Sequence, residues 1–185
     1  MTAARAILIY SLEQYRVLGY SLNLLVAHKI AYFLQRLGEP LNLKFEKGFY
    51  GPYAHNLFHL LSYLNGNYIK FDVDENKPTT LIQIIRKNYN EVEDFYQTSV
   101  SEEQKQRTKL LLDLIDGFES PFGLELLATV DFVGAQIKTS DLEEIISKIS
   151  DWTTRKKSLM KPYYIQVAAD RLLNTGLLKG EFALS

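Results

Sequence analysis

The stretch Lys47-Gly-Phe-Tyr-Gly-Pro-Tyr-Ala-His-Asn-Leu57 is the most constrained part of this chain. Two glycines, one proline and three aromatic residues within eleven positions leave the backbone few conformations. Gly48 permits a tight turn, and Pro52 after Gly51 suits the first position of a helix, where a missing N–H costs nothing. We therefore expect a strand to turn sharply into a helix here, with Gly48, Gly51 and Pro52 as structural residues.

The flanking segments predict a mainly α (α+β) fold, a compact domain of six to eight helices with a small antiparallel β-sheet. Residues 41–46 alternate apolar and polar side chains, as in a half-buried strand, and 68–73 and 81–85 are candidate partner strands. From hydrophobic periodicity and capping residues, helices are expected over 3–18, 22–37, 52–64, 88–96, 101–118, 120–137, 140–149 and 161–174. With no linker or repeat, residues 1–185 are expected to form a single domain.

Composition favours a soluble domain from a reducing compartment. The chain has 185 residues, is 46% hydrophobic and contains no cysteine, so disulfides, thiolate catalysis and cysteine-ligated metals are excluded. The apolar run from Ala6 to Tyr10 is too short to span a bilayer, and a cytoplasmic location without membrane attachment is expected. A formal net charge of −1 makes nucleic acid an unlikely partner, because broad phosphate neutralisation needs a basic face.

The search for catalytic motifs predicts no enzyme, no metal and no cofactor. His55 and His59 lie four residues apart on the expected helix, but Asn56 stands where a zinc protease needs glutamate. No glycine-rich nucleotide loop or nucleophile elbow occurs. Adjacent carboxylates such as Glu102 and Glu103 point about 100° apart on a helix and do not converge on one substrate atom.

Several segments together resemble the C-terminal domain of the DarG family, the antitoxins of the DarTG toxin–antitoxin systems. The segments are Lys29–Gln35, Gly38–Leu41, Lys47–Leu57 and Gly117–Val130, with weaker matches at Trp152–Lys157 and Ala169–Leu173. The helix, the strand and the Tyr-Gly-Pro turn are also distantly similar to the Panacea group of antitoxin domains.

The resemblance implies a partner and a function. In the DarG family the toxin, DarT, is an ADP-ribosyltransferase that modifies bases in single-stranded DNA. A macrodomain of DarG removes the modification, and the C-terminal domain binds the toxin. This chain has no macrodomain segment, so the resemblance implies an antitoxin domain without enzymatic activity. It would bind a DarT-type toxin and be fused to, or act beside, an ADP-ribosyl glycohydrolase macrodomain.

Residues and resemblance together suggest DNA mimicry. A toxin that binds single-stranded DNA offers a basic groove with stacking sites, so carboxylates replace phosphates and aromatic rings replace bases in a protein that blocks it. The toxin-binding residues expected on this basis are Phe49, Tyr50, Tyr53, His55, Asn56, Glu91, Glu93 and Asp94.

Three alternatives remain from the sequence. The segment from Arg171 to Leu178 resembles the end of a winged-helix unit, which would make the chain a DNA-binding autorepressor with Arg155, Lys156 and Lys157 on phosphate. A small enzyme would have to use His55 and His59 with the tyrosines as acid–base groups. A purely structural module would use the Tyr-Gly-Pro motif only to fix the corner.

Overall fold

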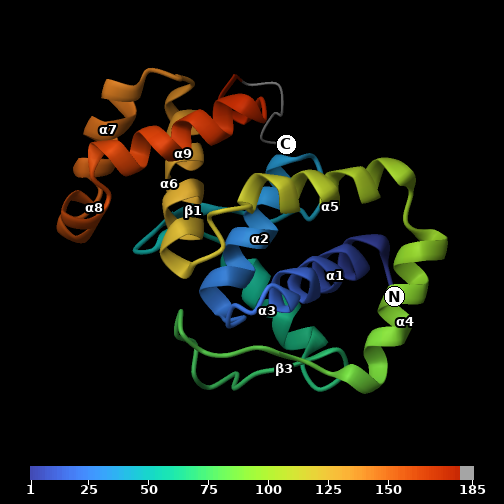
Figure 1. Ribbon diagram of the computed structural model, residues 1–185. Coiled ribbons are helices and arrows are strands. Elements are labelled where there is room, and N and C mark those ends of the chain that lie inside the picture. Colours follow the sequence, from blue (N-terminus) through green and yellow to red (C-terminus); the bar gives the residue numbers. More distant parts are fainter. Residues whose placement is uncertain (180–185) are drawn as a thin grey trace.

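Nine α-helices and two short strand pairs make up residues 1–179, the part of the chain that the computed structural model describes (Figure 1). This confirms the mainly α class with a small antiparallel sheet. The elements are α1 (Ala3–Val17), α2 (Leu24–Arg36), β1 (Glu46–Gly48), β2 (Gly51–Tyr53), α3 (His55–Leu64), β3 (Ile69–Lys70), β4 (Gln83–Ile84), α4 (Arg86–Ser99), α5 (Glu102–Ile115), α6 (Pro121–Ile137), α7 (Leu142–Ser150), α8 (Thr154–Leu159), α9 (Pro162–Asn174) and the 3-10 turn η1 (Leu177–Lys179).

Helix starts follow local capping chemistry. Ser101 and the side chain three residues later form a reciprocal capping box at α5, and Ser120 Oγ accepts from the backbone N–H three residues on at α6. Asp141 does the same for α7. Thr153 Oγ1 accepts from an N–H of α8 at 3.1 Å, and this cap starts a helix in the basic run, where we expected none.

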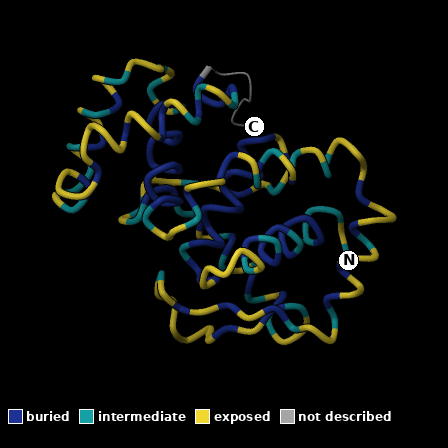
Figure 2. Tube along the Cα trace, viewed as in Figure 1, coloured by how far each residue is buried: buried dark blue, intermediate teal, exposed yellow. Residues whose placement is uncertain are grey.

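Helices α2 and α6 lie at the centre of the fold, and both are buried along almost their whole length (Figure 2). Helices α1 and α5 pack on α2, α4 packs on α1, and α7 and α9 pack on α6. Buried apolar residues from both groups of helices form one continuous core. Helix α6 therefore joins the N-terminal helices to the C-terminal ones.

The predicted strand at 41–46 is wrong, and the physical reason lies in α2. Asn42 has φ +54°, a left-handed conformation that interrupts an extended strand. The Gln35 side chain bonds both backbone groups of Leu43, accepting from its N–H at 2.7 Å and donating to its carbonyl at 2.9 Å. A side chain thus replaces the partner strand that this segment was expected to need.

The constrained stretch forms a β-hairpin instead of a strand-to-helix corner. β1 and β2 pair antiparallel, with Lys47 opposite Pro52 and Gly48 opposite Gly51. The helix predicted to start at Pro52 starts at His55. Proline is tolerated here because the hairpin has only two strands, so each is an edge strand.

The segments 68–73 and 81–85, expected as partners of 41–46 in one sheet, instead pair with each other over a shorter length. β3 and β4 pair antiparallel, with Ile69 opposite Ile84. The winged-helix ending was wrong for the described residues, since α9 is followed by a 3-10 turn rather than a strand.

Candidate functional site

Two aromatic residues occupy the tip of the β1–β2 hairpin. Phe49 is 55% exposed and packs edge-on against Tyr50, with ring centroids 4.8 Å apart. The Arg155 guanidinium lies 4.8 Å from the Tyr50 ring centroid, and Trp152 Nε1 donates to Gly48 O at 3.1 Å. A cation and an indole from the C-terminal part of the fold therefore fix the tip of the hairpin.

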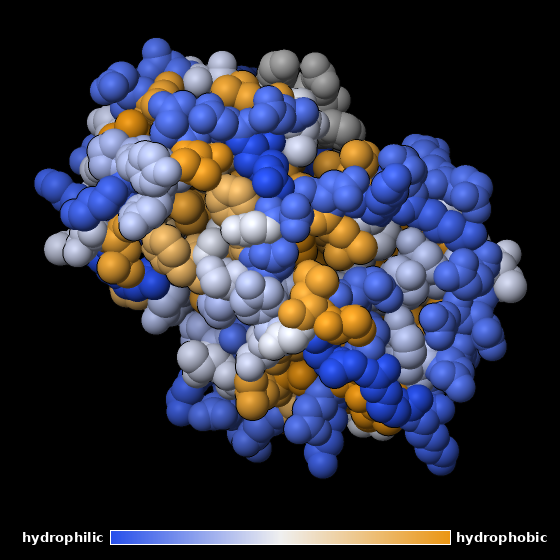
Figure 3. All heavy atoms as spheres, viewed as in Figure 1, coloured by the Kyte–Doolittle hydropathy of each residue, from blue (hydrophilic) through white to orange (hydrophobic). Residues whose placement is uncertain are grey.

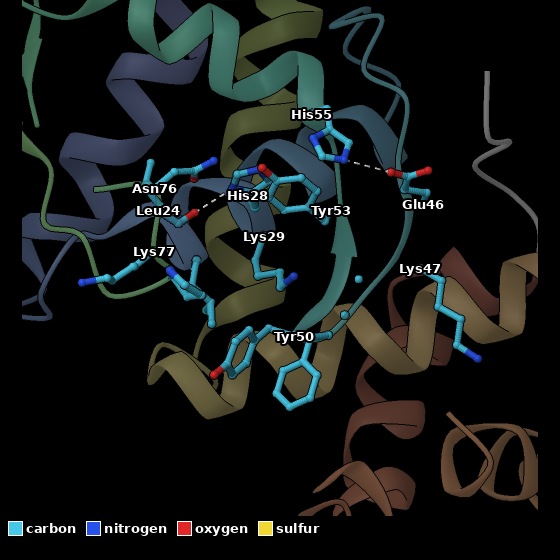
Figure 4. Close-up of a pocket in the computed structure, with 15 residues that line it drawn as sticks. Leu24, His28, Lys29, Glu46, Lys47, Tyr50, Tyr53, His55, Asn76 and Lys77 are labelled. Carbon is cyan, nitrogen blue, oxygen red and sulfur yellow. Dashed lines mark hydrogen bonds and ion pairs between the residues drawn. The ribbon is translucent and has the colours of Figure 1, made fainter. Parts of the chain in front are cut away.

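Beside the hairpin lies a cavity of about 410 Å³ (Figure 4). Helix α2 and the hairpin form its walls, and the loop around Lys77 closes it on a third side. Its lining residues are Leu24, Leu25, His28, Lys29, Glu46, Lys47, Gly48, Phe49, Tyr50, Gly51, Tyr53, His55, Asn76, Lys77 and Pro78. Figure 3 shows that hydrophobic groups on the face in view are interrupted by polar ones. A defined cavity is therefore a stronger candidate site than this face.

A stacked pair of rings forms one wall of the cavity. The His28 and Tyr53 rings are 4.4 Å apart between centroids and nearly parallel. Each imidazole nitrogen of His28 lies within hydrogen-bond distance of a carbonyl, 2.8 Å from Leu24 O and 3.3 Å from Ala54 O. Burial lowers the pKa of His28 to about 4, so the ring is neutral at physiological pH.

Lys29 is the buried cation of the cavity. The residue is 2% exposed, and its Nζ donates to Pro52 O at 2.8 Å. Burial, together with the charge of Lys156, lowers its pKa to about 7, while Glu125 opposes the shift. The Gly51 backbone passes close above it, at φ +90°, and a Cβ there would lie 3.4 Å from Lys29 Nζ and 2.8 Å from Thr129 Oγ1.

Glu125 of α6 collects cations behind the hairpin. Its carboxylate accepts from Arg155 at 2.6 and 3.1 Å and from Lys156 at 2.8 Å. The Lys156 side chain is fully buried, and burial lowers its pKa. The expectation that Lys156 meets DNA phosphate is therefore wrong, because its side chain is buried against Glu125. Arg155 is partly exposed and pairs with the same carboxylate, and Lys157 is exposed.

The structure brings together the hairpin residues that were expected to bind a partner. Phe49, Tyr50, Tyr53 and His55 all line the cavity, and His55 Nε2 lies 3.3 Å from Glu46 Oε1. Asn56 has a different position. Its side chain accepts from Lys44 N at 3.1 Å and donates to Asn42 O at 3.0 Å, which holds the segment before the hairpin.

The expected acidic residues lie elsewhere. Glu91, Glu93 and Asp94 are exposed on α4, at the opposite side of the molecule from the hairpin in Figure 1. Glu91 accepts a hydrogen bond from Tyr68 OH at 2.9 Å. The acidic and aromatic groups therefore do not form the single surface that DNA mimicry requires.

Sequence reasoning missed the residues that α2 and α6 contribute. Lys29 lies three residues after Val26 and four before Phe33, so it is a charge within the apolar stripe of a helix. Glu125 likewise lies in an almost wholly buried helix. Charge on a buried face is the signal that could have identified both residues.

Residues 1–179 show neither a membrane-spanning helix nor a cluster of metal ligands. No helix there is long and apolar enough to cross a membrane. The same residues contain no group of three or more His, Cys, Asp or Glu side chains placed to hold a metal ion.

Three similar proteins all have the same name. The chain is 36% identical over 181 residues to a protein of Thermus aquaticus named DNA ADP-ribosyl glycohydrolase. The aligned residues make up 98% of this chain and 49% of that protein. It is 29% identical over 154 residues to proteins of the same name from Mycobacterium tuberculosis and Mycobacterium bovis, covering 80% of this chain and 43% of each. The chain thus spans about half the length of these relatives. No family model matches it.

These names correct the function expected from the sequence. The relatives are named for an enzyme, DNA ADP-ribosyl glycohydrolase, whereas we expected a DarG-type antitoxin domain without enzymatic activity. The names give no support to toxin neutralisation, to DNA mimicry or to a DNA-binding autorepressor, and the separation of α4 from the hairpin removes the geometric basis of mimicry.

Proposed function

We propose that this chain takes part in removing ADP-ribose from DNA. It does so fused to, or acting beside, an ADP-ribosyl glycohydrolase macrodomain in the cytoplasm. The observation that carries the proposal is the 36% identity to a DNA ADP-ribosyl glycohydrolase over 98% of the chain. The match covers about half of that relative, and the other half is long enough to be the macrodomain of this proposal.

The cavity beside the hairpin is the part of this chain best suited to contact such a substrate. A buried ammonium, two stacked rings and an exposed aromatic tip are the groups that hold an anionic sugar nucleotide. A single modified nucleotide needs one pocket rather than a basic face. A net charge of −1 is therefore compatible with this substrate.

Glu46 is the candidate acid–base residue. It is the one carboxylate among the described residues that line the cavity, and it pairs with His55. Hydrolysis of a glycosidic bond is ordinarily assisted by a carboxyl group close to the scissile bond. Glu46→Gln retains the shape of the side chain and removes this chemistry.

The test uses DNA carrying ADP-ribose. Release of ADP-ribose is measured with the chain alone, with a glycohydrolase macrodomain alone, and with both together. We expect more rapid release in the presence of this chain than with the macrodomain alone. If the chain changes neither the rate nor the extent of release, the proposal is wrong. Release by the chain alone that Glu46→Gln abolishes would place the chemistry at the cavity.

A further inference from the structure

The charges behind the hairpin do not balance. Three cations, Lys29, Arg155 and Lys156, surround one carboxylate, Glu125. Glu125 forms ion pairs with Arg155 and Lys156, whereas no described carboxylate lies within ion-pair distance of Lys29. Burial disfavours the charged form of a lysine whose hydrogen-bond acceptor is a neutral carbonyl, and an anion beside it would stabilise that form.

Lys29, which has no ion-pair partner among the described carboxylates, forms part of the cavity wall although its side chain is almost wholly buried. Lys29 lines the 410 Å³ cavity, and in Figure 4 its side chain extends between the ring of Tyr53 and that of Tyr50. The lysines at the rim are engaged elsewhere. Lys77 Nζ pairs with Glu75 at 2.8 Å, and Lys47 Nζ lies 4.8 Å from the Trp152 ring centroid. Among the described lysines that line the cavity, Lys29 is therefore the one that an anion would meet without displacing an ion pair or a cation–π contact.

The rest of the lining indicates what carries the anion. Tyr53 and Tyr50 offer ring faces or edges at two sides of the cavity, and Leu24 and Leu25 line it with apolar groups. Tyr50 also lines a second cavity, of about 530 Å³, that extends to Arg155. Aromatic rings can pack against a base or ribose, and a cation beside them can bind the attached phosphate.

We infer that this cavity binds a phosphorylated nucleoside, with a phosphate on Lys29 Nζ and the nucleoside between Tyr50 and Tyr53. The inference names the ligand class of the proposed function, and the choice of ADP-ribose as a probe rests on that function. Lys29 is a binding residue in this assignment, and no chemical step is ascribed to it.

Binding would change the ionisation of Lys29. Its pKa of about 7 rises when a phosphate joins it, so binding above pH 7 takes up a proton and affinity falls as pH rises from 6 to 9. The charged and titratable groups around the cavity are Glu125 of α6, Lys156 of α8, Glu46 and Lys47 of β1, Tyr50 of the hairpin tip, Tyr53 of β2, His55 of α3, Lys77 of the loop before β4 and His28 of the same helix as Lys29. The side chain must therefore be observed directly, by NMR of protein labelled with isotopes in lysine.

The experiment is calorimetric titration of the full chain with inorganic phosphate, AMP and ADP-ribose. We expect AMP and ADP-ribose to bind more tightly than inorganic phosphate, and Lys29→Met to weaken nucleotide binding at least about tenfold. Lys44→Met, an exposed lysine outside the cavity, is the matched control and should bind as the wild type does. Thermal unfolding should show Lys29→Met to be no less stable than the wild type, because it removes a buried charge without a carboxylate partner.

Three results would overturn the inference. They are no binding of any probe, equal binding by Lys29→Met, and inorganic phosphate binding as tightly as the nucleotides. If Lys29→Met does not fold, NMR of the wild type decides, since a Lys29 resonance whose pKa does not rise with AMP contradicts the assignment. If the chain accelerates release of ADP-ribose from DNA but does not bind ADP-ribose, only the ligand assignment of the cavity is refuted. Binding without accelerated release would refute only the proposed function.

Discussion

Replacing Glu125 by glutamine tests whether the buried charge cluster stabilises the fold. The substitution retains size and removes the charge that pairs with Arg155 and Lys156. The Arg155 side chain is 29% exposed and can turn toward water, so its contribution is small. The Lys156 side chain is 0% exposed and cannot. Breaking a buried pair costs about 3–5 kcal/mol, and we expect about 3 kcal/mol, because glutamine leaves one acceptor for Lys156.

The assay is urea unfolding followed by fluorescence of Trp152, the single tryptophan, whose ring centroid is 5.0 Å from Lys156 Nζ. For a chain of 185 residues, about 3 kcal/mol corresponds to a fall in Tm of about 6–12 °C. Glu93→Gln, an exposed carboxylate on α4, is the control and should change stability by less than about 0.5 kcal/mol.

The pH dependence gives a second signature. The attraction between Glu125 and Lys156 exists only while Lys156 is protonated, and burial lowers the pKa of that ammonium. The difference in unfolding free energy between wild type and Glu125→Gln should therefore narrow as pH rises toward the ordinary lysine value. A loss no larger than that of the control, or a difference that widens with pH, would refute the reasoning.

Three further predictions concern a glycine, a helix cap and a histidine. Gly51→Ala should lower the unfolding free energy by about 1–3 kcal/mol in urea, because φ is +90° and the new Cβ would lie 2.8 Å from Thr129 Oγ1. Gly66→Ala, at φ +83° in open space, measures the cost of backbone strain alone. An equal loss of stability at both glycines would contradict a steric clash at Gly51. Ser101→Ala should cost about 0.5–2 kcal/mol through loss of the capping box, and an unchanged urea midpoint would count against that cap. Since burial lowers the pKa of His28 to about 4, stability should fall as pH drops from about 6.5 to 4, and His28→Gln should show a shallower fall in thermal unfolding across that range.

Helix caps could be predicted from the sequence, and contacts between distant segments could not. Ser101, Ser120 and Asp141 begin helices where the capping patterns predicted them, because each cap depends on residues only three positions away. The strand at 41–46 failed because Gln35, on the preceding helix, satisfies the backbone of Leu43. No periodicity rule contains that contact.

The candidate site divides in the same way. The hairpin aromatics were expected together because they are neighbours in sequence. Lys29 donates to a carbonyl 23 positions away, and that closure depends on how α2 packs against the hairpin. The autorepressor alternative placed Lys156 on DNA phosphate, whereas the side chain is buried against Glu125, 31 positions earlier in the chain.

Long-range hydrogen bonds mean that this fold can be completed only late in the synthesis of the chain. Tyr15 OH donates to Glu119 O and Trp152 Nε1 donates to Gly48 O, each across 104 positions, and Arg36 donates to Leu177 O across 141. Helices near the N-terminus leave the ribosome long before their partners are translated. Their apolar faces stay open during that interval, when contact with other nascent chains leads to aggregation. Slow elongation would lengthen this exposure, so the yield of folded protein should depend on translation rate and on chaperones that shield α1 and α2.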